Sequence, residues 1–225
     1  TELAASFPEF AGHHPYQLEL DERECCATMS RSFDHCGFPQ QITPLILTFN
    51  EEANLERTLA KLSWAREIVV VDSGSTDRTH AICAAHPNVR LQVRPFDDHA
   101  HQWNHGLREC GISTEWVLAL DADYVLSDAL VAEIGALAPA PDCPGYRVGF
   151  DYCVFGKPLR KSLYPPVTVL FRRAGASYTQ DGHTQRLQVQ GVPGMMSARI
   201  LHDDRKSLAR WLVAQDNYAR LECEL

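Results

Sequence analysis

The chain has 225 residues, of which 45% are hydrophobic, so it is long enough for one large domain with its own buried core. A net charge of −8 excludes a general nucleic-acid-binding protein, because that class carries a basic surface. The sequence contains no run of about 18 apolar residues, so no membrane span is predicted. It shows no secretory signal at its start, and its eight scattered cysteines are interpreted as reduced thiols of a cytosolic enzyme.

Residues 1–41 are interpreted as an N-terminal extension of unknown role, followed by a main domain over residues 42–225. The extension is irregular and carries several prolines and histidines. One group within it could bind zinc and consists of Cys25, Cys26, His35 and Cys36. Because its spacing fits no common zinc module, free thiols are the favoured interpretation.

The main domain begins with strands that alternate with helices. Short apolar strands are predicted at residues 45–48, 68–71, 89–93 and 117–120. Four helices follow these strands in turn. The first is predicted to start at a cap on Asn50, the second to end near Ala85, the third to span residues 103–110, and the fourth to start at a cap on Ser127. This alternation predicts an α/β fold with a mostly parallel, doubly wound sheet. Two further strands are predicted at residues 146–155 and 167–171.

Polar stretches follow three of the predicted strands, at residues 48–52, 72–77 and 121–123. Ligands of such sheets gather outside the carboxyl ends of the strands, so these stretches are expected to form one pocket. Asp121 and Asp123 lie two residues apart and can share a divalent cation such as Mg²⁺. The simpler alternatives are a capped turn at residues 72–77 and helix-capping acids at residues 121–123. Together the three stretches predict a pocket for a nucleotide diphosphate.

Several motifs resemble the inverting family 2 glycosyltransferases, which have the GT-A fold. They are Thr48-Phe49-Asn50-Glu51-Glu52, Asp72-Ser73-Gly74-Ser75-Thr76-Asp77, Gln102 with Asn104, and Asp121-Ala122-Asp123. Later segments resemble the lipopolysaccharide core β-1,4-glucosyltransferase branch most, namely Asp181-Gly182-His183 and residues 200–207. The resemblance implies a Rossmann-like sheet with small antiparallel additions on the acceptor side. It also implies transfer of a hexose such as glucose from a UDP-linked donor to a glycan or lipid-linked saccharide.

The resemblance assigns expected roles to individual residues. The nucleotide-sugar contacts expected from it are Thr48, Asn50, Glu51, Asp72, Gly74, Asp77, Gln102, Asn104 and Asp121. The candidate ligands for Mg²⁺ or Mn²⁺ are Asp123, Asp121 and His202, although a histidine at a strand end is often only solvated. For Gln102 and Asn104 the alternative is an exposed helix surface.

An inverting transfer needs a carboxylate base on the acceptor side. Asp181 is the candidate, because it falls where the resemblance places the base, although Gln180-Asp181 stands where a Glu-Asp pair is usual. Asp151 is the alternative base. The local sequence is equally consistent with a hairpin turn closed by Asp181-Gly182.

The C-terminal helix predicted over residues 207–225 carries Leu208, Trp211, Leu212 and Tyr218 on or near one face. Packing against the core with a solvated basic end is the favoured interpretation. The alternative is peripheral contact with the inner face of a membrane, because lipid-linked acceptors lie at an anionic surface.

Two other protein classes are also considered. One is a non-catalytic nucleotide-binding module, which would keep the pocket and lack a working base. The other is a haloacid-dehalogenase-like phosphatase, whose first motif Asp121-Ala122-Asp123 would match. That class places the motif on its opening strand, whereas three strands precede it here.

Overall fold

The computed structural model describes residues 37–154, 156–160, 165–182 and 184–223. Most of the expected N-terminal extension, including the possible zinc group, lies outside the described residues. A short 3-10 helix, η1 (Phe38–Gln41), leads directly into the first strand. The ring of Phe38 packs edge-on against that of Trp116, with 5.2 Å between centroids.

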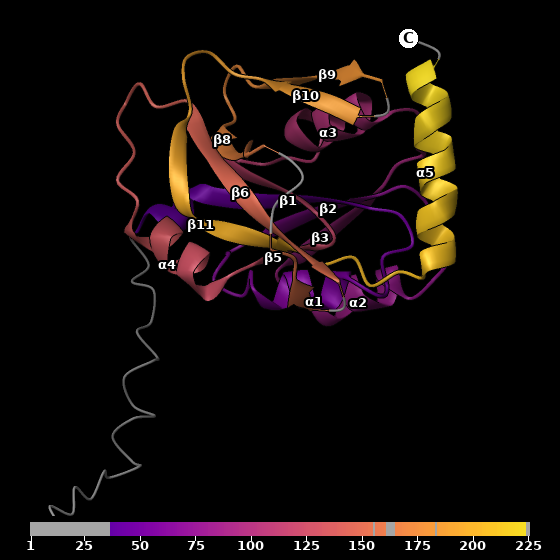
Figure 1. Ribbon diagram of the computed structural model, residues 1–225. Coiled ribbons are helices and arrows are strands. Elements are labelled where there is room, and N and C mark those ends of the chain that lie inside the picture. The colour runs from indigo at the N-terminus through magenta and orange to yellow at the C-terminus, as the bar shows by residue number, and fades with distance from the viewer. Residues whose placement is uncertain (1–36, 155, 161–164, 183, 224–225) are drawn as a thin grey trace, which may run out of the picture. The chain divides into compact units, whose positions relative to one another are not determined.

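A nine-stranded sheet forms the centre of the molecule (Figure 1). Its first four strands pair in parallel and are β1 (Ile42–Thr48), β2 (Ile68–Asp72), β3 (Val89–Val93) and β4 (Trp116–Asp121). The strand order is β3-β2-β1-β4-β8-β6-β11-β5, with β7 paired to β6. The predicted α/β fold with a parallel sheet is therefore confirmed.

The remaining strands supply the antiparallel additions. They are β5 (Tyr124–Leu126), β6 (Gly145–Val154), β7 (Lys157–Pro158), β8 (Val167–Arg172) and β11 (Gly194–His202). Strand β8 runs antiparallel to both β4 and β6, whereas β11 runs parallel to β6. Strands β9 (Ser177–Asp181) and β10 (Thr184–Gln188) form a separate hairpin. The hairpin interpretation of the Asp181-Gly182 turn is thus correct.

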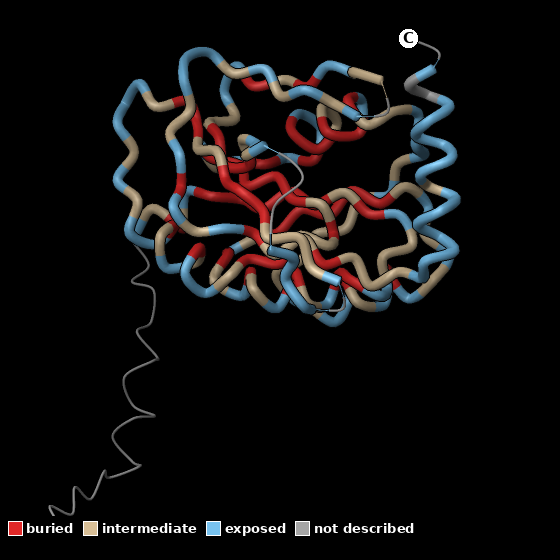
Figure 2. Tube along the Cα trace, in the orientation of Figure 1, coloured by how far each residue is buried: buried red, intermediate tan, exposed pale blue. Residues whose placement is uncertain are grey.

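Helices cover both faces of the sheet. The five α-helices of the described chain are α1 (Leu55–Ala60), α2 (Thr79–Ala85), α3 (His99–Arg108), α4 (Asp128–Ala136) and α5 (Leu208–Cys223). Helices α1, α2 and α4 lie on one face, and α3 lies with the β9–β10 hairpin on the other (Figure 1). Figure 2 shows the buried segments concentrated in the sheet between these two layers.

The alternation of side chains along the strands explains the two layers. Ile46 and Val70 belong to the core on the α1 side, whereas Leu45 and Val69 belong to the core on the α3 side. Gly106 lets α3 approach β1 closely, because a Cβ atom there would lie 2.7 Å from Leu45 Cδ1. The central strands β1 and β2 are therefore packed on both faces of the sheet.

Two expectations were wrong. Asn50 does not cap a helix, because its φ of 55° is left-handed and α1 begins only at Leu55. The described part of α5 does not pack into the core, since Leu208 is 69% and Leu212 56% exposed. An apolar helical period shows which side chains share a face, but it does not identify what covers that face. The predicted Ser127 cap is confirmed, because Ser127 Oγ accepts from Leu130 N.

Candidate functional site

The carboxyl ends of β1 and β2 are joined through the carboxylate of Asp72, which is completely buried. It accepts hydrogen bonds from Thr48 Oγ1 at 2.8 Å, from the backbone N–H groups of Gly74 and Ser75, and from Ser75 Oγ at 2.5 Å. The ring of His80 adds Nε2 at 2.7 Å from Asp72 Oδ1. A nucleoside N–H could bind this carboxylate only by replacing one of these donors, and the rotatable Ser75 hydroxyl is the simplest to displace.

The same turn also binds the loop after β1. Asn50 Oδ1 accepts from Thr76 N at 2.8 Å, and Asn50 N donates to Ser75 Oγ at 2.7 Å. Asp77 accepts from Glu52 N through one oxygen and from Thr79 N through the other. The capped-turn alternative is therefore correct for residues 72–77. Gly74 lies at its tip with a φ of 89° and no heavy atom within 4 Å of a Cβ position, so the backbone there is open to a ligand.

Asp121 and Asp123 occupy the carboxyl end of β4, and His202 reaches them from the end of β11. His202 Nε2 lies 3.2 Å from Asp123 Oδ2. The register explains this meeting, because β5 begins directly after Asp123 and pairs with β11, with Tyr124 opposite His202. The phenol of Tyr124 hydrogen-bonds Asp121. The structure thus pairs two of the predicted metal ligands, Asp123 and His202, and places the third, Asp121, within their electrostatic influence.

The electrostatics of this group are those of crowded acids. Burial, followed by the charge of Asp123, raises the pKa of Asp121 to about 6. Burial alone would raise the pKa of Asp123 as well, but its bond to His202 holds that pKa below the ordinary value. Burial lowers the pKa of His202, but the hydrogen bond and charge of Asp123 raise it by more, so the pKa lies above its ordinary value. A cation placed between these groups would relieve the repulsion between the two carboxylates.

Glu51 and Lys206 adjoin the same acids. Lys206 Nζ lies 2.6 Å from Glu51 Oε1, and Asn54 Nδ2 donates to Glu51 Oε2 at 2.9 Å. The Glu51 carboxylate is therefore paired with Lys206 in the structure. Its expected contact with the nucleotide stays a prediction. No role was predicted for Lys206 itself from the sequence, although it lies in the segment 200–207 that resembles the lipopolysaccharide core branch.

Gln102 and Asn104 both fix segments that border the carboxyl edge of the sheet. Gln102 is completely buried, so the helix-surface alternative is wrong for it, and its Nε2 donates to Ser73 Oγ at 3.0 Å. Asn104 bonds to both backbone groups of Tyr178, with Nδ2 donating to its carbonyl and Oδ1 accepting from its N–H. Asn104 thereby fastens the β9–β10 hairpin to α3.

The two candidate bases are both engaged in ion pairs. Asp181 ends β9 and accepts a bond from Arg186 Nε across the hairpin. Asp151 lies on β6, with Arg199 Nε at 2.7 Å from its Oδ1. The side chains of Asp181 and Asp151 are 40% and 41% exposed, so both remain accessible to a substrate.

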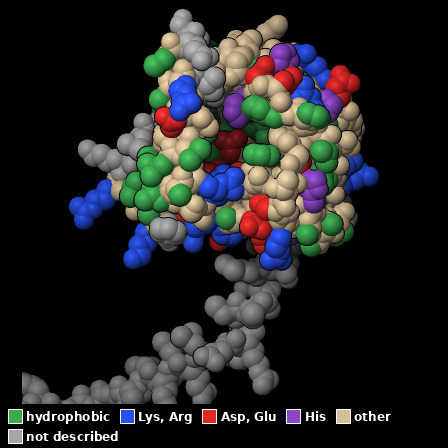
Figure 3. Space-filling view, turned by 90° about the vertical axis from the view of Figure 1, so that its right-hand side faces the viewer, with side chains coloured by type: hydrophobic (Ala, Val, Ile, Leu, Met, Phe, Trp, Pro, Cys, Tyr) green, Lys and Arg blue, Asp and Glu red, His purple; other side chains and the backbone are tan. Residues whose placement is uncertain are grey.

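The carboxyl edge opens onto the side of the molecule where α5 stands. Figure 3 shows this side, with an acidic side chain at the floor of a hollow and histidine and basic side chains around it. Arg210 of α5 donates to the backbone carbonyl of Asn50 at 3.3 Å, so the helix stands next to the loop after β1.

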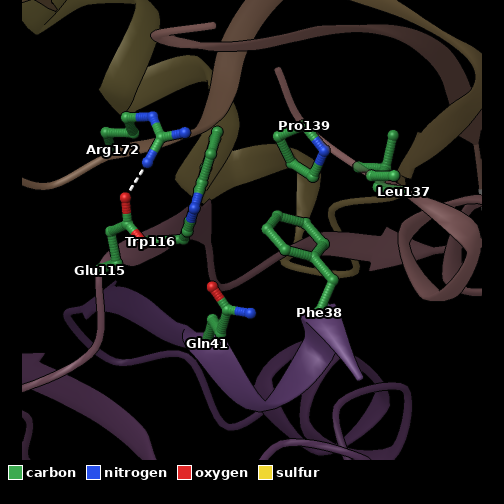
Figure 4. Close-up of a pocket in the computed structure, with 8 residues that line it drawn as sticks. Phe38, Gln41, Glu115, Trp116, Leu137, Pro139 and Arg172 are labelled. Atoms are coloured by element: carbon green, nitrogen blue, oxygen red, sulfur yellow. Dashed lines mark ion pairs between the residues drawn. The ribbon is translucent and has the colours of Figure 1, made fainter. Parts of the chain in front are cut away.

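A separate pocket of about 290 Å³ is shown in Figure 4. Its lining includes Phe38, Trp116 and Arg172, with Arg172 paired to Glu115 and stacked over the Trp116 ring. Trp116 opens β4, whereas Asp121 closes it, so this pocket lies at the opposite end of the strand. It is not the site at which the predicted residues meet.

Another acidic group also lies apart from that site. Asp97, Asp98 and His101 are the only three potential ligands in the described chain whose ligand atoms all lie within 4.8 Å. The group has a structural explanation, since Asp98 caps α3 through His101 N and Asp97 pairs with Arg94. The ligand atoms of Asp121, Asp123 and His202 do not all lie within 4.8 Å of one another. These residues nevertheless occupy the carboxyl edge, where ligands of such sheets bind.

The fold is that of GT-A glycosyltransferases. The structure superposes on that of Staphylococcus aureus TarS 1–349 in complex with UDP-GlcNAc with a TM-score of 0.55 and 15% identity. The superposition covers 74% of this chain and 59% of the TarS chain, so this chain spans about three fifths of that structure. At this identity the likeness shows the fold alone.

The sequence comparison is more specific. Residues 45–186 match the family described as Glycosyl transferase family 2, and the chain belongs to that family. Family membership decides against the phosphatase and identifies the protein as a glycosyltransferase.

Individual relatives agree with this assignment. The lipopolysaccharide core biosynthesis glycosyltransferase LpsC of Rhizobium meliloti is 27% identical over 197 residues, which cover 81% of this chain and 70% of LpsC. An uncharacterized glycosyltransferase of Rickettsia bellii is 35% identical over 96 residues, covering 42% of this chain and 32% of the relative. None of the helices in the described parts of the chain has the length and apolar character needed to span a bilayer.

Proposed function

We propose that this glycosyltransferase moves a hexose, with glucose as the first candidate, from a UDP-linked donor to a saccharide of the lipopolysaccharide core type, with inversion. The observation that carries the proposal is the convergence of Asp121, Asp123 and His202 at the carboxyl edge of the sheet, beside the Asp72 turn. The similarity to LpsC supports the acceptor class.

A divalent cation fits the residues present. His202 Nδ1 is buried and has no hydrogen-bond partner among the described residues, and two crowded carboxylates lie beside this ring. Carboxylates and imidazole are ligands that Mn²⁺ accepts, whereas Mg²⁺ prefers the oxygens. Asp123 and His202 would hold the cation, with Asp121 beside them. When bound, it would neutralise the charge that develops on the leaving diphosphate.

The remaining steps belong to side chains. Inversion requires the acceptor hydroxyl to attack the anomeric carbon from the face opposite the diphosphate, with Asp181 accepting its proton. Arg186 holds the Asp181 carboxylate before the acceptor arrives. The loops after β1 and β2 hold the nucleoside, with Gly74 at the open tip of the turn and exposed Phe49 as a flat surface for the base.

A donor screen tests this function. The protein is incubated with UDP-, GDP- and dTDP-hexoses, with Mg²⁺, Mn²⁺ or EDTA, and release of the nucleotide is measured with and without lipopolysaccharide core acceptors. The expected result is turnover of a UDP-hexose that stops in EDTA and accelerates with acceptor. Binding of UDP without any turnover, or turnover confined to GDP- or dTDP-sugars, would contradict the proposal.

We also propose that α5 meets the membrane that carries a lipid-linked acceptor. Leu208, Leu212 and Val213 are more than half exposed on a helix that stands beside the site. Arg210 on the same helix suits an anionic lipid surface, whereas the charge of Arg220 is paired with Asp216. The helix would bring the site to its acceptor.

A further inference from the structure

The loop between β11 and α5 places one lysine at the acidic edge. Lys206 Nζ lies 2.6 Å from Glu51 Oε1 and 3.9 Å from Asp204 Oδ2, and only 22% of its side chain is exposed. Its charge lowers the pKa values of both Asp121 and Asp123. The ammonium group therefore lies within electrostatic reach of Asp121 and Asp123, the acids at the proposed cation site that would face the diphosphate.

This lysine belongs to a fixed loop. Lys206 N donates to Asp204 Oδ1 at 2.9 Å, and Arg205 N donates to Asn54 Oδ1 at 2.8 Å. Asn54 is completely buried and also donates to Asp204 Oδ1 and Glu51 Oε2. The loop is thus clamped to the residue that precedes α1, and the ammonium position is set before any ligand binds.

The same loop is fastened from a second side. Arg57 of α1 donates to Asp203 Oδ2 at 2.9 Å and to the Asp203 backbone carbonyl at 2.7 Å. Asp203 is 4% exposed and also accepts from Gly156 N. Charged groups that are ordered in advance stabilise developing charge best, because they need no reorganisation during the reaction.

The structure assigns to Lys206 a catalytic role that rests on the proposed function: it donates hydrogen bonds to the diphosphate of the donor and stabilises the leaving nucleotide. An ammonium has three N–H donors, and Glu51 takes one at close range. The others can reach a phosphate oxygen. As the bond from the anomeric carbon to the phosphate oxygen breaks, its electron pair stays on that oxygen. The acceptor oxygen bonds to the carbon, its proton passes to Asp181, and Lys206 keeps its own proton.

The competing explanation is purely structural. Lys206 could serve only to tie Glu51 to the loop before α5. In that case its loss would weaken the whole edge and affect every ligand alike. A contact with the diphosphate would instead discriminate between UDP and uridine, because uridine lacks the phosphates.

The experiment compares Lys206→Met with wild type and with Lys206→Arg. Lys61→Met is the matched control, since Lys61 Nζ makes an equally short 2.6 Å ion pair with Asp128 on the surface. Affinities for UDP and uridine are measured by calorimetry in EDTA, alongside thermal unfolding and the kcat and KM of transfer. Lys206→Gln replaces Lys206→Met if that variant does not fold.

In Lys206→Met we expect the affinity for UDP to fall roughly 10- to 100-fold, which is the effect of losing one hydrogen bond to a charged group. The affinity for uridine should be unchanged. We expect kcat to fall about 10²–10³-fold, with partial recovery in Lys206→Arg and no change in Lys61→Met. Equal loss for UDP and uridine, or unchanged UDP affinity, would overturn the assignment. Absence of turnover in wild type would refute the proposed function instead, while the comparison of UDP with uridine would still decide the role of Lys206.

Discussion

At the scale of single residues, Asp72 shows how one buried carboxylate organises a binding edge. Four donors from Thr48, Gly74 and Ser75 converge on it, together with the His80 ring. The carboxylate fixes the turn at residues 72–77. The proposed contribution of Asp72 to nucleoside binding must therefore be measured together with its contribution to stability.

Asp72→Asn should destabilise the protein by roughly 1–3 kcal/mol, because an amide cannot accept from all of these buried donors. Although burial raises the pKa of Asp72, its bonds from Ser75, His80 and Thr48 lower it below the ordinary 3.8. The folded state therefore favours the charged form, whose stabilisation is present above pH 3.8 and is lost as the pH falls below it. Urea unfolding of wild type and variant between pH 3 and pH 7 measures this.

The control for this prediction is Asp128→Asn, since the Asp128 side chain is 90% exposed. It should unfold like wild type at every pH. A stability of Asp72→Asn equal to that of wild type at pH 7 would show that the carboxylate bonds contribute nothing net.

Asp123→Ala should abolish the part of UDP affinity that depends on Mn²⁺ or Mg²⁺, because the side chain joins His202 at the proposed cation site. Calorimetry with UDP, with and without metal, is the measurement. Asp97→Ala is the control from the separate group at the start of α3. If Asp97→Ala removes the metal dependence and Asp123→Ala does not, the cation binds at α3.

At the scale of elements, the β9–β10 hairpin carries the proposed base and α5 carries an uncovered apolar face. Asp181→Asn should slow transfer about 10²–10⁴-fold, the usual contribution of a positioned general base, and leave UDP affinity unchanged. Single-turnover transfer and UDP titration measure the two effects. Asp151→Asn is the comparison, because Asp151 also pairs with an arginine. Loss of transfer only in Asp151→Asn would make Asp151 the base.

For α5 we predict that the double substitution Leu208→Asp and Leu212→Asp lowers binding to vesicles of phosphatidylcholine with phosphatidylglycerol by at least about tenfold. These side chains are 69% and 56% exposed, and burying each leucine in lipid is worth about 1.5–3 kcal/mol. Co-sedimentation is the measurement. Val192→Asp is the control, since Val192 is 89% exposed on a different loop. Equal loss in the control would refute a specific role for α5.

The strands of the first half could be predicted closely, and β3 has the predicted bounds. Strands β1, β2 and β4 contain short apolar runs, and β3 alternates apolar with polar residues, so local sequence indicates each of them. Strands β5 and β11 were not predicted, because they form by pairing with segments distant in the chain. The contact of Glu51 with Lys206 spans 155 positions and has no local signature. The meeting of Asp123 with His202 could be proposed only from the resemblance.

At the scale of the whole molecule, stability should be distributed unevenly. Strand β2 is buried throughout, whereas nearly every described side chain of α5 is exposed. Hydrogen exchange measured by mass spectrometry should show the slowest amides in β1, β2 and β4 and much faster exchange along α5, since sparse tertiary contacts favour local opening. Protection of α5 equal to that of β1 would mean that another molecule covers this helix in solution.

The hairpin shares no backbone pairing with the nine-stranded sheet in the described structure. It is fastened to α3 by Asn104, which bonds both backbone groups of Tyr178, by the Tyr178 ring stacked on Trp103 with 5.4 Å between centroids, and by Ala100 N donating to Gln180 Oε1. A segment held by side-chain contacts rather than by strand pairing can be exchanged as a unit, provided that these contacts are kept. Because the hairpin carries the proposed base, evolution or a protein engineer could then alter the acceptor side of the proposed reaction while the donor half stays as it is.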